Sequence, residues 1–285
     1  MRIKLGLIFM FFGVLACTPQ DYGKLTFLDD IPLAINETSG LIYDRENDLI
    51  WTHNDSGNAP ILFGVKPGIG IVKEIHLEDN IDWEDVAFDG NFVYVADTGD
   101  NNNTRTERSI YLVPKELLGQ AEKIINYSPK VIHFSLPDQP KKRPKKKNRN
   151  FDIEAIAALE NELLLFTKNR SSNFDGISKV YRLPKKAGNY TAEPIAELVI
   201  CKDKKICLVT GAAYHKDSKQ LVLITSDKLI LYQNFTGTFS KNKPHIIALE
   251  HRSQKEAIDF INAEYVIISD ERNKKGGGNL FRFKL

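Results

Sequence analysis

Hydrophobic and polar positions follow one pattern that recurs five times along the chain. Each copy begins with a polar residue, continues with a short apolar segment, a turn and a second apolar run, and ends in a polar cluster. Short apolar runs bounded by turns predict β-strands, and their repetition predicts a fold built from equivalent units. The copies begin at Glu37, Glu84, Glu154, Thr210 and Glu256.

The runs between the copies predict how each unit is completed. Two further strand-like runs follow each of the first four copies, such as "ILFGV" and "IVKEIHL" after the first. Only "NLFRFKL" follows the fifth, so the missing strand would come from the N-terminal segment, residues 24–33. Four antiparallel strands per unit, repeated radially and closed by strands from both termini, predict an all-β propeller without an open edge. We expect five blades; six is the alternative, if the long interval between the second and third copies hides a degenerate one.

That long interval contains an insertion, residues 136–150, which is broken by prolines and strongly basic. We expect a disordered or solvated loop there. Such a loop could dock on anionic lipid headgroups or on phosphate-rich polysaccharide. Residues 24–285 as a whole should form a single propeller domain.

Composition adds limits on size and partners. The chain has 285 residues, of which 42% are hydrophobic, and this is enough apolar material for a large core. The formal net charge is +2, so no strong positive field favours nucleic acid. We expect a monomer without a nucleic-acid partner.

The N-terminus, residues 1–17, has the features of a targeting segment. "MRIK" is basic, and the apolar stretch "LGLIFMFFGVLA" is shorter than a typical transmembrane helix. It ends in "VLAC", which resembles the bacterial lipobox, whose cysteine (here Cys17) becomes the lipidated first residue; an ordinary secretory signal is the alternative. Thr18 in place of aspartate favours the outer membrane. We therefore expect a lipid-anchored protein of the bacterial cell envelope, on its periplasmic or surface face.

Two cysteines remain, Cys201 and Cys207, in "CKDKKIC". In an exported protein an even pair at this spacing predicts a disulfide that closes a small loop. A metal site would need further cysteine or histidine ligands nearby.

Two columns of polar residues emerge when the five copies are aligned. The first column holds the residues that begin each copy, and the second follows the second apolar run. Because the two strands of a copy are antiparallel neighbours and the first lines the channel, both columns should ring one mouth of that channel. The second column reads Asn54, Asp97, Lys168, Ser226 and Asp270.

Carboxylates that converge on a narrow axis must take up protons, pair with bases or bind a cation. Oxygen ligands without histidine or cysteine suit Ca²⁺. Two alternatives are a water-filled mouth and a structural role, in which the glutamates accept backbone N–H bonds. The segment 97–105, "DTGDNNNTR", has the composition of a calcium loop without EF-hand spacing, and also that of an ordinary turn. The candidate metal ligands are Glu37, Glu84, Asp97, Glu154, Glu256 and Asp270.

The motifs "ETSGL", "THNDSGN", "DWEDVAF", "DTGDN" and "FDIEAIA" resemble the phytase-like (esterase-like) β-propeller group and the related SdiA-regulated propeller family. The resemblance covers roughly residues 35–275 and fits a bacterial lipoprotein member. It implies a propeller and, in some members, a cation at the mouth. Phytase-type propellers carry a denser acidic cluster with several bases that bind two phosphates. Thr210 departs from that pattern, because it stands where the other copies have glutamate.

Two functions follow from these features, and the sequence favours the first. The first is a binding module, whose mouth holds a small molecule, glycan or protein. Trp51, His53 and Trp83 lie beside the columns, where they could stack on a ligand or pack inside the blades. The second is a metal-dependent phosphoesterase, in which metal-bound water attacks phosphorus while bases neutralise the phosphoryl oxygens. The candidate bases are Lys168, Arg105, Arg170 and Arg272.

Overall fold

The computed structural model describes residues 20–240, 242–274 and 276–285. The targeting segment and Cys17 lie outside these residues, so the signal and the lipid anchor stay predictions. Within the described ranges, no helix has the length and apolarity needed to cross a membrane.

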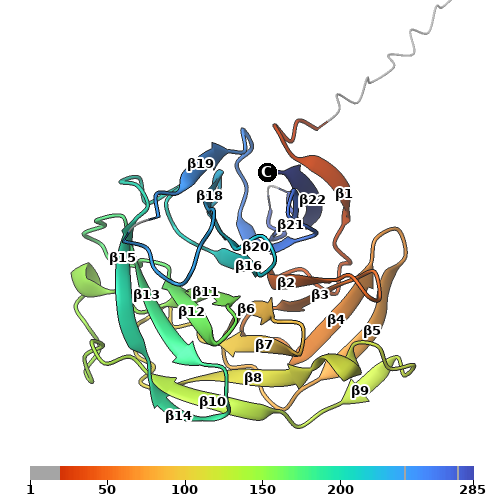
Figure 1. The fold of residues 1–285 in the computed structure, drawn as a ribbon, viewed down its shortest axis with the longest axis horizontal. Helices are drawn as coiled ribbons and strands as arrows, with labels where there is room; N and C mark the ends of the chain where they lie inside the picture. The colour runs from red at the N-terminus through yellow and green to blue at the C-terminus, as the bar shows by residue number, and fades with distance from the viewer. Residues whose placement is uncertain (1–19, 241, 275) are drawn as a thin grey trace, which may run out of the picture.

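Five sheets are arranged around a central axis, so the chain is a five-bladed β-propeller (Figure 1). This confirms the predicted fold, and the six-bladed alternative is wrong. From the axis outward, blade one contains β2 (Thr38–Asp44), β3 (Leu49–Asn54), β4 (Ile61–Lys66) and β5 (Gly70–His76). Blade two contains β6 (Trp83–Phe88), β7 (Phe92–Asp97), β8 (Arg108–Pro114) and β10 (Lys130–Ser135). Blade three contains β11 (Ile153–Ala158), β12 (Glu162–Thr167), β13 (Ile177–Pro184) and β15 (Glu193–Val199).

Blade four contains β16 (Gly211–His215), β17 (Gln220–Ile224), β18 (Lys228–Tyr232) and β19 (His245–Ala248). Blade five contains β20 (Lys255–Phe260), β21 (Tyr265–Asp270), β22 (Asn279–Lys284) and the N-terminal β1 (Thr26–Asp30). β1 pairs antiparallel with β22, from Thr26 opposite Arg282 to Asp30 opposite Asn279, and the two lie side by side in Figure 1. The segment 24–33 therefore closes the ring, as its sequence predicts.

Two short strands depart from the prediction of four strands per blade. β9 (Ile124–Asn126) lies between β8 and β10 in the chain, yet it pairs in parallel with β5 of blade one. β14 (Gly188–Thr191) lies between β13 and β15, yet it pairs in parallel with β10 of blade two. Each covers the outer edge of the preceding blade, which would otherwise expose unpaired backbone groups. The chain segments of blades two and three thus each contribute one short strand to the sheet of the preceding blade.

The hydrophobic core lies between the blades. Apolar side chains on the facing sides of neighbouring sheets interdigitate, as when Tyr94 and Ile110 of blade two pack with Ile156 and Leu165 of blade three. All four are fully or almost fully buried. Alternating strand positions supply both faces of each blade, and this explains why the inner strands are apolar over most of their length.

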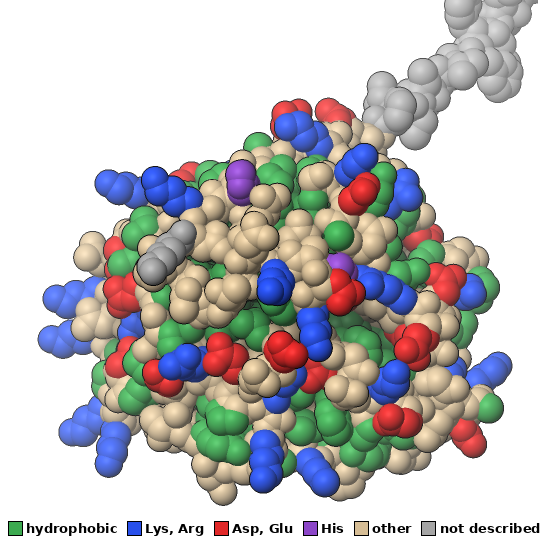
Figure 2. All heavy atoms as spheres, viewed as in Figure 1, with side chains coloured by type: hydrophobic (Ala, Val, Ile, Leu, Met, Phe, Trp, Pro, Cys, Tyr) green, Lys and Arg blue, Asp and Glu red, His purple; other side chains and the backbone are tan. Residues whose placement is uncertain are grey.

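The basic insertion, residues 136–150, includes the short 3₁₀ helix η2 (Lys146–Asn148), and η1 (Lys115–Leu117) lies in the connection after β8. All five lysines of the insertion are exposed. Arg143 donates to Asn102 Oδ1 at 2.6 Å, and Gln139 donates to Asp100 Oδ2 at 3.3 Å. Figure 2 shows basic and acidic side chains interspersed over the face in view. That face carries no large patch of a single charge.

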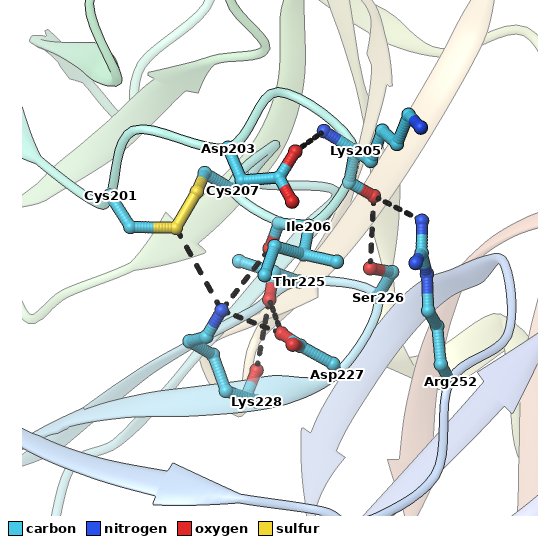
Figure 3. Close-up of a disulfide and its surroundings, with 10 residues drawn as sticks. All are labelled: Cys201, Asp203, Lys205, Ile206, Cys207, Thr225, Ser226, Asp227, Lys228 and Arg252. Atoms are coloured by element: carbon cyan, nitrogen blue, oxygen red, sulfur yellow. Dashed lines mark hydrogen bonds and ion pairs between the residues drawn. A yellow bond between two sulfur atoms is a disulfide. The ribbon is translucent and has the colours of Figure 1, made fainter.

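The Cys201–Cys207 disulfide is present in the loop between β15 and β16, which confirms the predicted pairing (Figure 3). The loop is also held by its backbone, because Lys205 O accepts hydrogen bonds from Arg252 Nη2 at 3.2 Å and from Ser226 Oγ at 3.4 Å. The bridge therefore fixes a loop that touches the next two blades.

Replacing both cysteines with serine is expected to lower the free energy of unfolding by about 2 kcal/mol, because the closed loop is short and restricts the unfolded chain only modestly. Urea denaturation of the oxidised wild type and the double variant measures this. Wild type unfolded in reducing agent should match the variant. A change below roughly 0.5 kcal/mol would mean that the Arg252 and Ser226 contacts already fix the loop.

Candidate functional site

The inner strands of the blades approach closely at the axis. A Cβ atom at Gly40 would lie 2.6 Å from Val86 N, so only glycine fits between β2 and β6. Asp85 is fully buried there and accepts hydrogen bonds from Val86 N and Ile156 N, both at 2.8 Å, and from the backbone of Ala212. One carboxyl group thus joins the inner strands of blades two, three and four.

One mouth of the channel is a cavity of about 210 Å³, which we call the acidic mouth. Four of the five first-column residues line it, as the alignment predicts. Thr210 does not, and its hydroxyl donates to Lys255 O at 2.5 Å. The lining residues are Glu37, Thr38, Ser39, Asp55, Glu84, Asn101, Glu154, Lys168, Arg170, Gln254, Glu256 and Glu271.

β-Bulges aim three of these glutamates at the axis. In blade two, Trp83 pairs with Asp97 and Asp85 pairs with Ala96, so Glu84 is the extra residue between them. The same shift leaves Glu154 and Glu256 unpaired in their inner strands. A bulge bends its strand and redirects the side chain of the extra residue. Blade four keeps regular pairing at its inner strand and has threonine there.

The densest group of acids surrounds Glu84. Carboxylate oxygens of Glu84, Asp55 and Asp82 lie within 4.8 Å of one another, and so do those of Glu84, Asp152 and Glu154. In this group, Glu84 Oε1 and Asp82 Oδ1 are buried without a hydrogen-bond partner; Asp270 Oδ2, outside the cavity, is the third such carboxylate oxygen among the described residues. Burying a carboxylate oxygen without a partner costs free energy of folding. Glu84 Oε1 and Asp82 Oδ1 are therefore available as ligands for a cation.

Two bases reach the acidic mouth. Lys168 Nζ lies 2.7 Å from Glu154 Oε2 and 3.7 Å from Glu256 Oε2, and Arg170 pairs with both Asp152 and Glu154. Both side chains lie on the blade-three side. Neither base forms an ion pair with Glu84 within the described part of the chain.

Burial controls the protonation of this group. Burial and the charge of Glu154 raise the pKa of Glu84 well above its usual range, and the same two causes raise the pKa of Asp152 to about 8. Burial acts in the same direction on Glu154, but Lys168 and Arg170 outweigh it and lower the pKa of Glu154 to about 2. At neutral pH the group therefore retains protons that a metal ion would displace.

The other predicted site residues lie outside the cavity. Asp97 accepts from Ile81 N and Asp82 N and pairs with Arg105 at 2.8 Å. Asp270 accepts from the backbone and side-chain amides of Asn279, both at 2.9 Å. Arg272 donates to Ile31 O at 2.9 Å. These four side chains hold backbone around the mouth.

The segment 97–105 forms a turn around a buried ion pair. Asp100 accepts hydrogen bonds from Thr104 N at 2.6 Å and Arg105 N at 2.9 Å, and it pairs with Arg108 at 3.0 Å. Arg108 is fully buried. The carboxylate of Asp100 is thus occupied by donors from its own turn, from Arg108 and from Gln139.

The aromatic residues beside the columns belong to the core. Trp51, His53 and Trp83 are fully buried, and the rings of His53 and Trp83 lie 5.5 Å apart, edge to face. Burial lowers the pKa of His53 to about 4, so its ring is neutral at physiological pH. All three residues therefore pack inside the blades and do not stack on a ligand at the mouth.

Four acids that line the mouth or lie beside Glu84 were not among the candidate ligands: Asp55, Asp82, Asp152 and Glu271. Asp82 and Asp152 each precede a first-column glutamate by two residues, in the repeated Asp-x-Glu pattern of "DWEDVA" and "DIEAIA". Asp55 and Glu271 each follow a second-column residue directly. The Asp-x-Glu repeat is the signal that could have found the first pair.

Comparisons with known proteins do not assign this chain to a family. No family model and no curated protein sequence matches the chain. Similar solved structures include a chain in the crystal structure of a nidogen/laminin complex, with a TM-score of 0.43 and 11% identity over 83% of this chain and 73% of that one. Another is a hypothetical selenium-binding protein from Sulfolobus tokodaii, with a TM-score of 0.44 and 10% identity over 85% of this chain and 74% of that one. The resemblance to phytase-like and SdiA-regulated propellers stays a prediction, and the five-bladed fold follows from the strand pairing of the chain itself.

Proposed function

We propose that the protein is a binding module whose acidic mouth holds a divalent cation, with Ca²⁺ the best match, and presents it to a ligand. The observation that carries this proposal is the pair of buried carboxylate oxygens without partners, Glu84 Oε1 and Asp82 Oδ1. Asp55 and Asp152 place further oxygens within 4.8 Å of Glu84. A hard cation with several oxygen ligands fits this donor set, which contains no sulfur or nitrogen.

The side of the mouth toward blade four suits an acidic group on the ligand. There Lys168 and Arg170 border a second hollow of about 770 Å³, which Lys205 and Arg252 also line. A cation at Glu84 and bases across the opening would together attract a ligand that carries a carboxylate, sulfate or phosphate group. Small acidic molecules, acidic glycans and acidic protein segments all present such groups.

Calcium titration tests the cation. Isothermal calorimetry should show saturable Ca²⁺ binding, and Glu84→Gln should weaken it at least about tenfold, because the amide removes a charged ligand from the centre of the group. Mg²⁺ should bind more weakly, since it demands stricter geometry. Glu264→Gln, which removes the same charge at an exposed position, should bind like wild type. Absence of binding or of a thermal shift with every divalent ion would refute the proposal.

A phosphoesterase is the second candidate, because Lys168 and Arg170 lie beside the carboxylates in the same cavity. A metal-bound water flanked by two bases is the arrangement that phosphoryl transfer to water requires. Assays with p-nitrophenyl phosphate and phytate in the presence of Ca²⁺ distinguish the two functions. Turnover that Glu84→Gln abolishes would favour the enzyme, and Ca²⁺ binding without turnover would favour the binding module.

We also propose that Cys17 is lipidated and anchors the propeller in the bacterial cell envelope, on the outer membrane. The basic n-region, the apolar segment and "VLAC" support this. The membrane would then be a partner through the anchor. Mass spectrometry of the mature N-terminus tests it: an acylated Cys17 supports the anchor, and an unmodified N-terminus elsewhere refutes it.

A further inference from the structure

The end of the channel opposite the acidic mouth is a second cavity, of about 340 Å³, which we call the opposite mouth. The acidic mouth lies where the inner strands start, and the opposite mouth lies where they end. Residues from all five blades line it. Neither the cation nor the acidic ligand proposed above involves it.

Aromatic residues stand near the end of the inner strand in four blades at this mouth. Tyr43, Phe88, Tyr214 and Phe260 each stand at or next to the end of their inner strand, and all four line the cavity. Ala158 takes the position in blade three. Phe260 is buried, whereas the other three rings are partly exposed. The repeat thus places several aromatic rings around one cavity.

Asp259 adds a charge beside these rings. It is partly buried, and its Oδ2 accepts a hydrogen bond from Tyr43 N at 2.7 Å, with a further bond from the backbone of Phe260. An ionised carboxylate offers about four acceptor sites, so these bonds leave acceptor capacity. Burial raises the pKa of Asp259 to about 6, a value at which the carboxylate is still mainly ionised at pH 7.5.

The neighbouring charges compensate Asp259 only in part. Asp89 pairs with Lys185 at 2.6 Å, and Glu160 pairs with Lys216 at 3.5 Å at the rim. Arg45 is exposed at the rim, and its charge partly offsets the effect of burial on the pKa of Asp259. In the part of the chain that the structure describes, no lysine or arginine forms an ion pair with Asp259. A carboxylate half-removed from water gains most from a cationic partner that is itself weakly hydrated.

We propose that the opposite mouth binds a small organic cation, an ammonium group whose charge lies against Asp259 and whose carbon substituents contact the aromatic rings. Aromatic faces attract alkylammonium ions through their quadrupole, and a neighbouring carboxylate adds a direct charge interaction. The cavity is large enough for a molecule of the size of choline. Inorganic cations would prefer the oxygen-rich acidic mouth instead.

Calorimetry with choline tests this proposal, carried out in EDTA so that no divalent ion is present. For a ligand of this size we expect a dissociation constant on the order of 1 mM. The neutral carbon isostere, 3,3-dimethylbutan-1-ol, should bind at least about tenfold more weakly, because it has the same shape without the charge. Equal affinity for the two molecules, or no saturable choline binding, would overturn the proposal.

Variants locate the site. Asp259→Asn keeps an oxygen for Tyr43 N and should weaken choline binding at least about tenfold. Phe88→Leu, which keeps the apolar volume and removes the ring, should weaken it several-fold. Glu264→Gln removes the same charge at a position outside the cavity whose side chain is 71% exposed, and it should leave the affinity unchanged.

Glu84→Gln separates this site from the acidic mouth. Unchanged choline binding in that variant supports the proposal, and its loss would place choline at the acidic mouth and overturn it. Melting temperatures show whether each variant is folded. If Asp259→Asn fails to fold, the comparison of choline with its isostere on the wild-type protein still tests whether the site recognises the positive charge.

Discussion

Asp85→Ala is expected to lower the free energy of unfolding by about 4 kcal/mol. The variant leaves the N–H groups of Ile156 and Ala212 buried without their acceptor, and each such loss costs roughly 1–3 kcal/mol. It also opens a void where the inner strands of three blades meet. Urea denaturation measures the effect.

Asp85→Asn tests whether both carboxyl oxygens are needed as acceptors. Val86 N donates to Oδ1 and Ile156 N donates to Oδ2, so the amide nitrogen of asparagine would face one of these N–H donors, and the variant should still lose about 1–3 kcal/mol of stability. Asp217→Ala, in the exposed turn before β17, serves as the control and should change little. If Asp85→Ala costs no more than Asp217→Ala, the carboxyl does not join the blades energetically.

The metal-free protein is expected to lose several kcal/mol of stability as pH rises from about 6 to 9, at roughly 1.4 kcal/mol per pH unit for each carboxyl group that the folded state keeps protonated. Burial raises the pKa of Asp152 and Glu256 to about 8, and of Asp82 and Glu271 to about 7, compared with about 4 in the unfolded chain. The folded state therefore binds protons that the unfolded state has released. That contribution is complete at low pH and disappears as pH rises through 7 to 8.

Calcium should remove this dependence, because the ion takes the place of the protons and neutralises the carboxylates. Melting temperatures measured across the range in EDTA and in CaCl₂ test both statements. Proton release on binding at pH 7, detected by calorimetry in buffers of different ionisation enthalpy, gives a second readout. Constant or rising stability with pH in EDTA would contradict the expected protonation of the mouth.

The blades could be predicted from the sequence because each repeats one pattern of apolar runs, and the antiparallel pairing of the first two strands placed Glu37, Glu84, Glu154 and Glu256 at one mouth. The bulges could not be predicted. Nothing in the sequence around Glu84 marks it as the extra residue of a bulge, yet the bulge turns its side chain toward the axis. Asp97 keeps regular strand pairing, and its side chain accepts a backbone hydrogen bond instead. The strands β9 and β14 were missed because they have only three and four residues and pair outside their own blade.

The strands β9 and β14 divide the ring into two arcs whose blades are joined in different ways. β9 and β14 join blades one, two and three by backbone hydrogen bonds, whereas the boundary between blades three and four has the disulfide loop near it. The acids around Glu84 all belong to the first arc, with Asp55 following β3 and Asp152 preceding β11. Lys205 and Arg252 belong to the second. The half of the mouth that would hold an ion is therefore preorganised by backbone pairing between blades, while on the other half the disulfide loop and the bond from Arg252 to Lys205 O hold the two bases in place.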